Sequence, residues 1–250
     1  MTDISMSFLL TFIAGFSTMI GTILIFIKFK NIDKVICSSL AFAAGVMSIV
    51  SITDLIPESL SLLKVNFNNI FPVLICLFFI ILGIIISMLM DYYLPNENTY
   101  SNNKLYRVGI ISMLAIILHN IPEGIATFMA GNSDKTLAIS LTIAIALHNI
   151  PEGISIAIPI YYSTKSKLKA CLYTLVSSLS EPFGALLAYL FLSKFITDTF
   201  LGILFAIIAG IMMQIAFCEL LPTSNKYNYK KITIIFFLVG ILFMLLKFII

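Results

Sequence analysis

The sequence contains one hexapeptide twice, and the two copies hold the only two histidines in the chain. The copies read His-Asn-Ile-Pro-Glu-Gly, at positions 119–124 and again at 148–153. Both lie within apolar stretches that otherwise carry no charge. Ionisable side chains in such stretches are costly and usually functional, so the composition predicts that each motif has a partner.

Helical geometry predicts what each motif presents. At about 100° per residue, Glu123 lies between His119 and Asn120 on one face of a helix. A carboxylate flanked by an imidazole and an amide oxygen can serve one metal ion or bridge two ions. The candidate metal ligands of the two copies are His119, Asn120, Glu123, His148, Asn149 and Glu152. The alternative is that each histidine merely pairs with the glutamate of its own helix.

Five further residues are weaker candidates. Glu181 precedes a proline inside an apolar segment and offers a third carboxylate, or else a helix-packing glutamate bonded to a serine. Met47 is a possible thioether ligand, although methionine is also a common core filler. The carboxylates Asp54, Glu58 and Glu219 are either relays at the entrance and exit of a metal path or interfacial groups at helix ends.

The donor types restrict the metal. Imidazole, carboxylate and amide suit borderline divalent ions such as Zn²⁺, Fe²⁺, Mn²⁺, Co²⁺ and Cd²⁺, whereas a Cu⁺ site would favour thiolates. The four cysteines are scattered singly through apolar segments without paired spacing, which is typical of core residues. No cofactor is expected besides these ions.

Composition predicts the elements that must position these residues. Hydrophobic residues make up 60% of the chain, charged residues 11%, and the mean hydropathy is +1.08, which indicates an all-α integral membrane protein. Since a span needs about 20 apolar residues, we expect one transmembrane domain over residues 1–250, whose first helix is retained rather than cleaved as a signal peptide. The eight expected spans are about 4–27, 35–56, 70–90, 106–130, 137–161, 168–191, 200–221 and 232–250.

Basic residues predict the orientation of these spans. The loops after the first, third, fifth and seventh spans hold 11 of the 15 Lys and Arg residues. The positive-inside rule therefore places these loops in the cytoplasm and both termini outside. The net charge of +3 has no stripe of basic and aromatic residues with it, so a lipid bilayer is expected as a partner and nucleic acid is not.

A weaker repeat relates the two ends of the chain. At one fixed offset, called the first offset below, the Ala-Gly-Val-Met at 44–47 matches the Ala-Gly-Ile-Met at 209–212, and Asp54 falls on Glu219. At a slightly shorter second offset, Ser17 falls on Ser180 and Gly21 on Gly184. With eight spans, the matching helices run in opposite directions. The sequence thus predicts a 3+2+3 arrangement with an inverted repeat of spans one to three and six to eight, as in alternating-access transporters.

These motifs together resemble the ZIP (Zrt/Irt-like) metal transporters, in particular their bacterial zinc-uptake branch. The resemblance rests on the doubled hexapeptide, the Ser-x-x-Glu-Pro-x-Gly around Glu181 and the Ala-Gly-x-Met before Asp54, and it covers all eight spans. It implies zinc uptake across the cell membrane and, in some members, homodimers. The loop at 91–105 departs from the family, because many members carry a histidine-rich stretch there.

The resemblance also implies a binuclear metal site. One ion would be held by the ligand set His119, Glu123, His148 and Glu152. A second ion would be held by the ligand set Asn120, Glu123, Asn149, Glu152 and Glu181.

Transport of zinc, and of ions such as Fe²⁺, into the cytoplasm is the leading interpretation of the sequence. The rival is an intramembrane metal-dependent hydrolase, since two bridged ions can activate water. Against it, the HExxH spacing of zinc proteases is absent from the sequence. A proton-coupled carrier of organic solutes would use the same His and Glu residues but explains the two asparagines poorly.

Overall fold

The computed structural model describes residues 3–93, 103–133, 135–192 and 197–246, and these residues form helices and short connections without strands. The first half contains α1 (Asp3–Ser17), η1 (Thr18–Phe26), α2 (Ile32–Val50), η2 (Ser51–Leu55), α3 (Ile56–Asn66), α4 (Phe71–Tyr93) and α5 (Asn103–Ser133). The second half contains α6 (Lys135–Thr164), α7 (Lys167–Leu187), η3 (Ala188–Leu192), α8 (Asp198–Gln214), η4 (Ile215–Leu220), α9 (Leu221–Asn225) and α10 (Lys230–Leu245).

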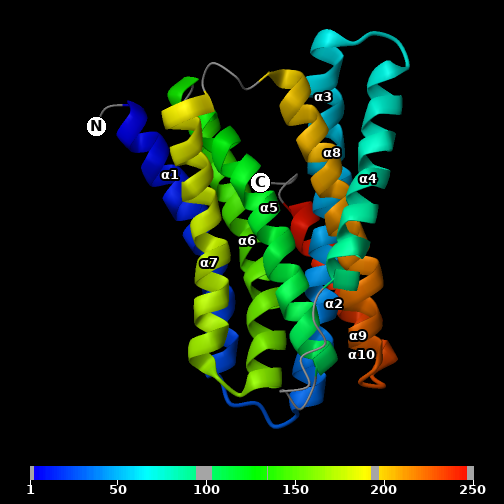
Figure 1. Cartoon of the computed structure of the whole chain (residues 1–250). Coiled ribbons are helices and arrows are strands. Elements are labelled where there is room, and N and C mark those ends of the chain that lie inside the picture. The colour runs from blue at the N-terminus through cyan, green and yellow to red at the C-terminus, as the bar shows by residue number, and fades with distance from the viewer. Residues whose placement is uncertain (1–2, 94–102, 134, 193–196, 247–250) are drawn as a thin grey trace.

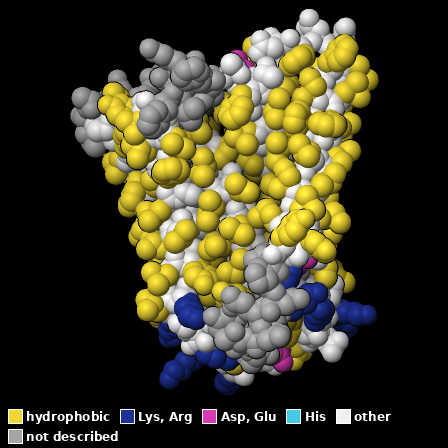
Figure 2. Space-filling model, in the orientation of Figure 1, with side chains coloured by type: hydrophobic (Ala, Val, Ile, Leu, Met, Phe, Trp, Pro, Cys, Tyr) yellow, Lys and Arg dark blue, Asp and Glu magenta, His cyan; other side chains and the backbone are white. Residues whose placement is uncertain are grey.

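The helices are long and apolar enough to cross a membrane. Seven such segments occur among the described residues, of which the most apolar, Phe71–Tyr93, has a mean hydropathy of 3.2 with only 17% of its best window buried. Hydrophobic side chains cover the flank of the molecule in Figure 2. The all-α membrane class is thus confirmed. The count of eight stays a prediction, because the expected last span is described only to residue 246.

The helices form two groups, with the motif helices on one side (Figure 1). One group contains α1, η1, α5, α6 and α7, and the other contains α2, α3, α4, α8, α9 and α10. Within the groups, α5 contacts both α6 and α7, while α2 contacts α10 and α4 contacts α8. The candidate ligands therefore belong mainly to the first group, whereas Asp54 and Glu58 belong to the second.

The last glycine of each hexapeptide lies where two helices cross. A Cβ atom at Gly124 would overlap the backbone carbonyl of Glu181, and one at Gly153 would overlap that of Thr18. Only a residue without a side chain allows the backbones to approach so closely. The motif glycines thus hold α5 against α7 and α6 against η1.

The two segments related by the first offset share local structure. Both α2 and α8 continue into a π-helical segment, η2 at Ser51–Leu55 and η4 at Ile215–Leu220. The Ser59 hydroxyl donates to the carbonyl of Gly202 at 2.6 Å, and the Ser224 hydroxyl donates to that of Cys37 at 2.8 Å. The first offset places Ser59 on Ser224 and also Cys37 on Gly202. The local geometry is thus repeated; the inverted 3+2+3 topology itself stays a prediction.

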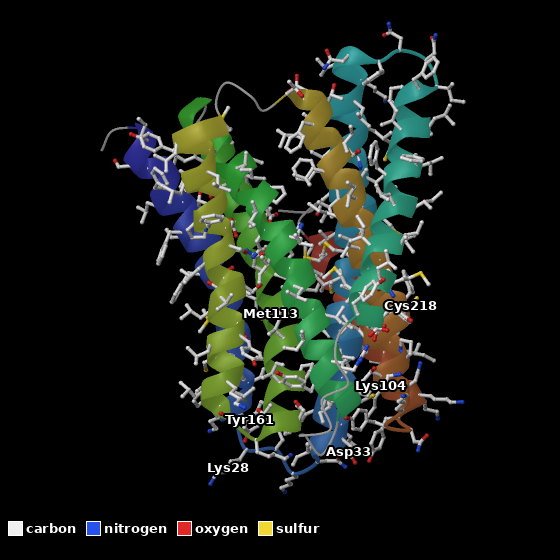
Figure 3. The ribbon with its side chains drawn as sticks, viewed as in Figure 1. Lys28, Asp33, Lys104, Met113, Tyr161 and Cys218 are labelled. Atoms are coloured by element: carbon white, nitrogen blue, oxygen red, sulfur yellow. The ribbon has the colours of Figure 1, made fainter. Side chains whose placement is uncertain are left out.

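Basic side chains gather at one end of the molecule (Figure 2). Figure 3 places Lys28, Asp33 and Lys104 toward this end, where Arg107 of α5 also pairs with the Asp91 carboxylate of α4 at 2.7 Å. Most of the loop at 91–105 lies outside the described residues, as do Lys194 and Lys247. The basic end therefore marks one face of the expected membrane.

Candidate metal centre

Three neighbouring helices carry the candidate ligands. The first hexapeptide lies on α5, the second on α6, and Glu181 lies on α7. Pro122 and Pro151 sit inside helices that continue on both sides of them. Since α5 contacts both α6 and α7, the three helices bring both motifs and Glu181 to one place.

The imidazoles and carboxylates of the two copies face one another. His148 Nε2 lies 3.0 Å from Glu123 Oε1, while His119 Nε2 lies 3.4 Å from Glu123 Oε2 and 3.6 Å from Glu152 Oε1. Ligand atoms of His119, His148 and Glu152 all lie within 4.8 Å of one another. Because His148 pairs with the glutamate of the other copy and His119 also lies near Glu152, pairing within a single helix alone does not account for this cluster.

The two asparagines extend the cluster toward α1 and α7. The Asn149 side chain donates to Glu181 Oε2 at 2.9 Å and to the carbonyl of Ala14 at 3.0 Å. The Asn120 side chain donates to the carbonyl of Ser177 at 3.4 Å. Glu181 is therefore bonded to an asparagine of the second motif, and the expectation of a packing glutamate bonded to a serine does not describe this contact.

The cluster leaves an unusual number of buried polar atoms unsatisfied. The side chains of His119, Asn120, Asn149, Glu152 and Glu181 belong to residues with 0% exposure. Both oxygens of Glu152, one oxygen of Glu181 and the amide oxygens of both asparagines have no hydrogen-bond partner. Buried polar groups without partners are rare in native proteins and call for an explanation. A divalent ion bound by these atoms would provide one.

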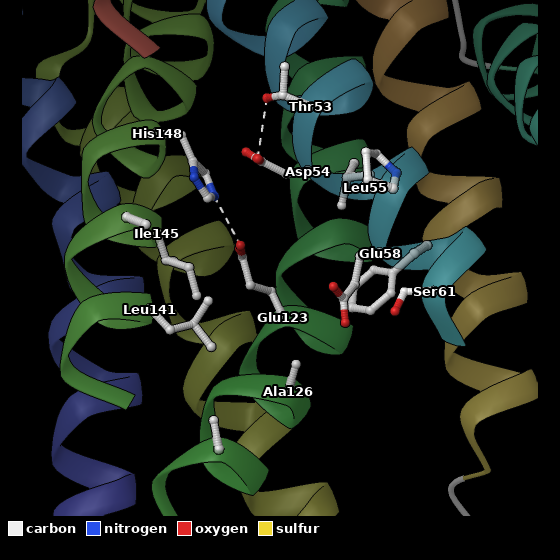
Figure 4. A pocket seen from close by; sticks show the side chains of 14 residues that line it. Thr53, Asp54, Leu55, Glu58, Ser61, Glu123, Ala126, Leu141, Ile145 and His148 are labelled. Carbon is white, nitrogen blue, oxygen red and sulfur yellow. Dashed lines mark hydrogen bonds and ion pairs between the residues drawn. The ribbon is translucent and has the colours of Figure 1, made fainter. Parts of the chain in front are cut away.

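A cavity of about 740 Å³ leads to the cluster from one side (Figure 4). Glu123 and His148 line it, together with Asp54 and Glu58 from the other helix group. Its lining also includes Ala130, near the end of α5 that is remote from Arg107. The cavity thus reaches the cluster from the end opposite the basic side chains, and the two carboxylates proposed as entrance relays lie along it.

The remaining candidates lie elsewhere. Met47 is fully buried in the main hydrophobic core, where Met212, its counterpart at the first offset, also lies. Glu219 belongs to η4 and does not line the cavity that contains Asp54. A metal-binding role for Met47 and an exit role for Glu219 therefore stay predictions, as does ion binding by the cluster itself.

Thr18 of η1, which is not among the candidates predicted from the sequence, lies beside the second motif. Its hydroxyl is fully buried and has no hydrogen-bond partner, and its backbone carbonyl lies against Gly153 of the second motif. A signal for it existed, because the second offset, which aligns Ser17 with Ser180, also aligns Thr18 with Glu181.

The helices and the cluster together define a polytopic membrane protein with a buried set of imidazole, carboxylate and amide side chains, donor types that suit borderline divalent ions. The family of ZIP zinc transporters matches residues 95–247 of the chain. A protein from Akkermansia muciniphila named zinc transporter ZupT is 39% identical over 254 residues, which cover 95% of this chain and 94% of the relative.

Other relatives with the same name agree with this match. The ZupT of Clostridium perfringens is 38% identical, over 98% of this chain and 95% of its own length. The ZupT of Streptococcus mutans is 36% identical, over 95% of this chain and 94% of its own length. The chain belongs to the ZIP zinc transporter family, and it is of the ZupT type.

Proposed function

We propose that this protein carries Zn²⁺ as its substrate across the cell membrane into the cytoplasm, through the cluster formed by the two hexapeptides and Glu181. The observation that carries this proposal is the set of buried ligand atoms without hydrogen-bond partners at the base of a cavity. The names of the relatives support a zinc carrier over the hydrolase considered above.

The ligand set supports a site for two ions. The carboxylates Glu123, Glu152 and Glu181 would offset three of the four positive charges of two divalent ions, while the imidazoles and amides add neutral donors. Such a site binds ions without neutralising them completely, which favours release. The same donors suit Fe²⁺, Mn²⁺, Co²⁺ and Cd²⁺, so we include these ions as possible further substrates.

We infer the direction of transport from the positions of the charges. The positive-inside rule places the basic end in the cytoplasm and both termini outside. The cavity then opens outward, and Asp54 and Glu58 attract cations toward Glu123 and His148. We propose alternating access, in which the two helix groups rearrange so that the cluster later faces inward.

The wider architecture belongs to the same proposal. We propose one domain of eight spans over residues 1–250, with the inverted repeat supported by the matching π-helical segments and serine contacts. We also propose that copies of the chain form a homodimer, as some members of the family do. The exposed apolar surface of α4 is one face on which such contact could form.

Zinc uptake into proteoliposomes tests the function. The purified protein, the Glu152→Gln variant and the Asp33→Asn variant would be reconstituted with a zinc-sensitive dye inside the vesicles. Asp33 is an exposed carboxylate remote from the cluster, which makes it a matched control. We expect uptake by the parent and Asp33→Asn but not by Glu152→Gln. Uptake by the parent no faster than by empty vesicles would refute the proposal.

A further inference from the structure

The buried hydroxyl of Thr18 has no role in the site described above. Thr18 is the first residue of η1, has 0% exposure, and its Oγ1 atom has no hydrogen-bond partner. The preceding buried threonine of the same region behaves differently. The hydroxyl of Thr11, on α1 and also with 0% exposure, donates to the carbonyl of Ser7 at 2.9 Å. Thr223 Oγ1 is also buried without a partner, but it belongs to α9, whereas Thr18 lies against the second motif.

The contacts around the asparagines show that Thr18 and Glu181 occupy related positions. Asn149 donates to the carbonyl of Ala14, and Asn120 donates to that of Ser177. The second offset, which places Thr18 on Glu181, also places Ala14 on Ser177. Each asparagine of the doubled motif thus bonds to the same position of one of two related helices.

The glycine contacts repeat this relation one turn further along. The carbonyl of Thr18 lies over Gly153, the last residue of the second motif, and the carbonyl of Glu181 lies over Gly124, the last residue of the first. The backbone of Thr18 therefore has the same relation to α6 that the backbone of Glu181 has to α5. The Glu181 side chain reaches the cluster from α7. Thr18 occupies the corresponding position on η1, on the opposite side of the cluster.

The two positions differ in the side chain that they offer. Glu181 Oε2 accepts a hydrogen bond from Asn149 at 2.9 Å. By the same relation, Thr18 corresponds to Glu181 and Asn120 corresponds to Asn149. The threonine side chain is shorter by two carbon atoms and neutral. Both Thr18 Oγ1 and Asn120 Oδ1 are buried without a hydrogen-bond partner.

We propose that the Thr18 hydroxyl is an additional oxygen ligand of the metal site, on the side of Asn120, either directly or through a bound water. This inference rests on the proposed function, because it takes Zn²⁺ as the substrate of the cluster. Thr18 keeps the site at three carboxylates where a symmetric site would have four. It thereby limits the affinity for the second ion and prevents the site from becoming a trap.

Equilibrium binding of Zn²⁺ to the purified protein tests this role independently of transport. Thr18→Val keeps the shape of the side chain and removes the hydroxyl, so we expect the weaker zinc affinity to fall about five- to tenfold. Thr18→Ser should bind as the parent does. Thr18→Glu adds a fourth carboxylate, and we expect the weaker affinity to rise at least about a hundredfold while zinc uptake slows.

The control is Thr11→Val, which removes a buried hydroxyl from the same region without touching the cluster. Its zinc isotherm should match that of the parent. The proposal is overturned if Thr18→Val, or Thr18→Ala should the first variant not fold, binds zinc as Thr11→Val does. Failure of the proposed function would look different, because the parent itself would then take up no zinc into proteoliposomes.

Discussion

Substitution of Glu152 by glutamine separates a metal-binding role from a structural role. Glu152 is completely buried, and neither carboxylate oxygen has a hydrogen-bond partner. It contacts His119, whose Nε2 atom lies 3.6 Å from Glu152 Oε1. If this contact existed to stabilise the fold, the loss of one partner would leave the other buried and unpaired.

The two roles predict opposite effects on stability. Breaking a structural buried pair costs about 3–5 kcal/mol of the free energy of unfolding. If Glu152 is instead a metal ligand, the metal-free protein holds a buried carboxyl group without a hydrogen-bond partner, and glutamine replaces it by a neutral group of similar shape. We therefore expect Glu152→Gln to leave the metal-free protein equally stable or more stable.

Added zinc should stabilise the parent much more than it stabilises Glu152→Gln. At a free concentration one hundred times the dissociation constant, a bound ion stabilises the folded state by about 2.7 kcal/mol. The parent should gain this stabilisation, and Glu152→Gln should lose nearly all of it. The loss of one carboxylate charge explains why the variant gains so little. The Coulomb energy between a unit charge and a divalent ion about 4 Å away is large at an effective dielectric constant of about 20, and losing even a third of it weakens zinc binding about a hundredfold.

Thermal unfolding of the detergent-purified protein, followed by circular dichroism with a chelator or with zinc, measures both effects. The exposed Asp33→Asn variant serves as the control and should follow the parent in both conditions. The reasoning is refuted if Glu152→Gln lowers the stability of the metal-free protein by several kcal/mol yet keeps the zinc-induced gain.

Three further predictions concern the helix crossing, the cavity and the entrance. Gly124→Ala forces a methyl group onto the carbonyl of Glu181 and should cost more than about 2 kcal/mol, measured by the same unfolding assay. Ala126→Cys, which lines the cavity, should react with an impermeant thiol reagent at least ten times faster than the buried neighbour Thr127→Cys, with the native cysteines removed; equal rates would contradict the cavity. Asp54→Asn should slow zinc uptake up to about tenfold at low salt and less at high salt, with zinc affinity unchanged; a salt-independent effect would exclude steering.

The sequence predicted the membrane class and the approximate helices because the relevant signals are local. The apolar run at 70–90 appears as α4 at Phe71–Tyr93, and the two hexapeptides lie on helices as their spacing predicted. Helix boundaries depend on capping and were less accurate. The helix expected at 35–56 begins at Ile32, where the Asn31 side chain accepts from the backbone N–H of Lys34, and it continues as one candidate span to Asn66.

The sequence predicted that the side chains of the two hexapeptides face a common partner, but not how they pair. The helical angle places His119 and Glu123 on one face of one helix, and His119 Nε2 indeed lies 3.4 Å from Glu123 Oε2. The closer contact, between His148 and Glu123 at 3.0 Å, joins two helices and depends on how α5 and α6 cross. No periodicity within one helix contains that information. The bond between Asn149 and Glu181 depends in the same way on three-dimensional packing.

The central claim is that the clustered side chains of the two hexapeptides bind the transported zinc. Anomalous scattering at the zinc absorption edge, measured on crystals of the protein grown with Zn²⁺, locates the ion directly. We predict anomalous density between His119, Glu123, His148 and Glu152. Density confined to other positions, in a protein that takes up zinc, would contradict the claim.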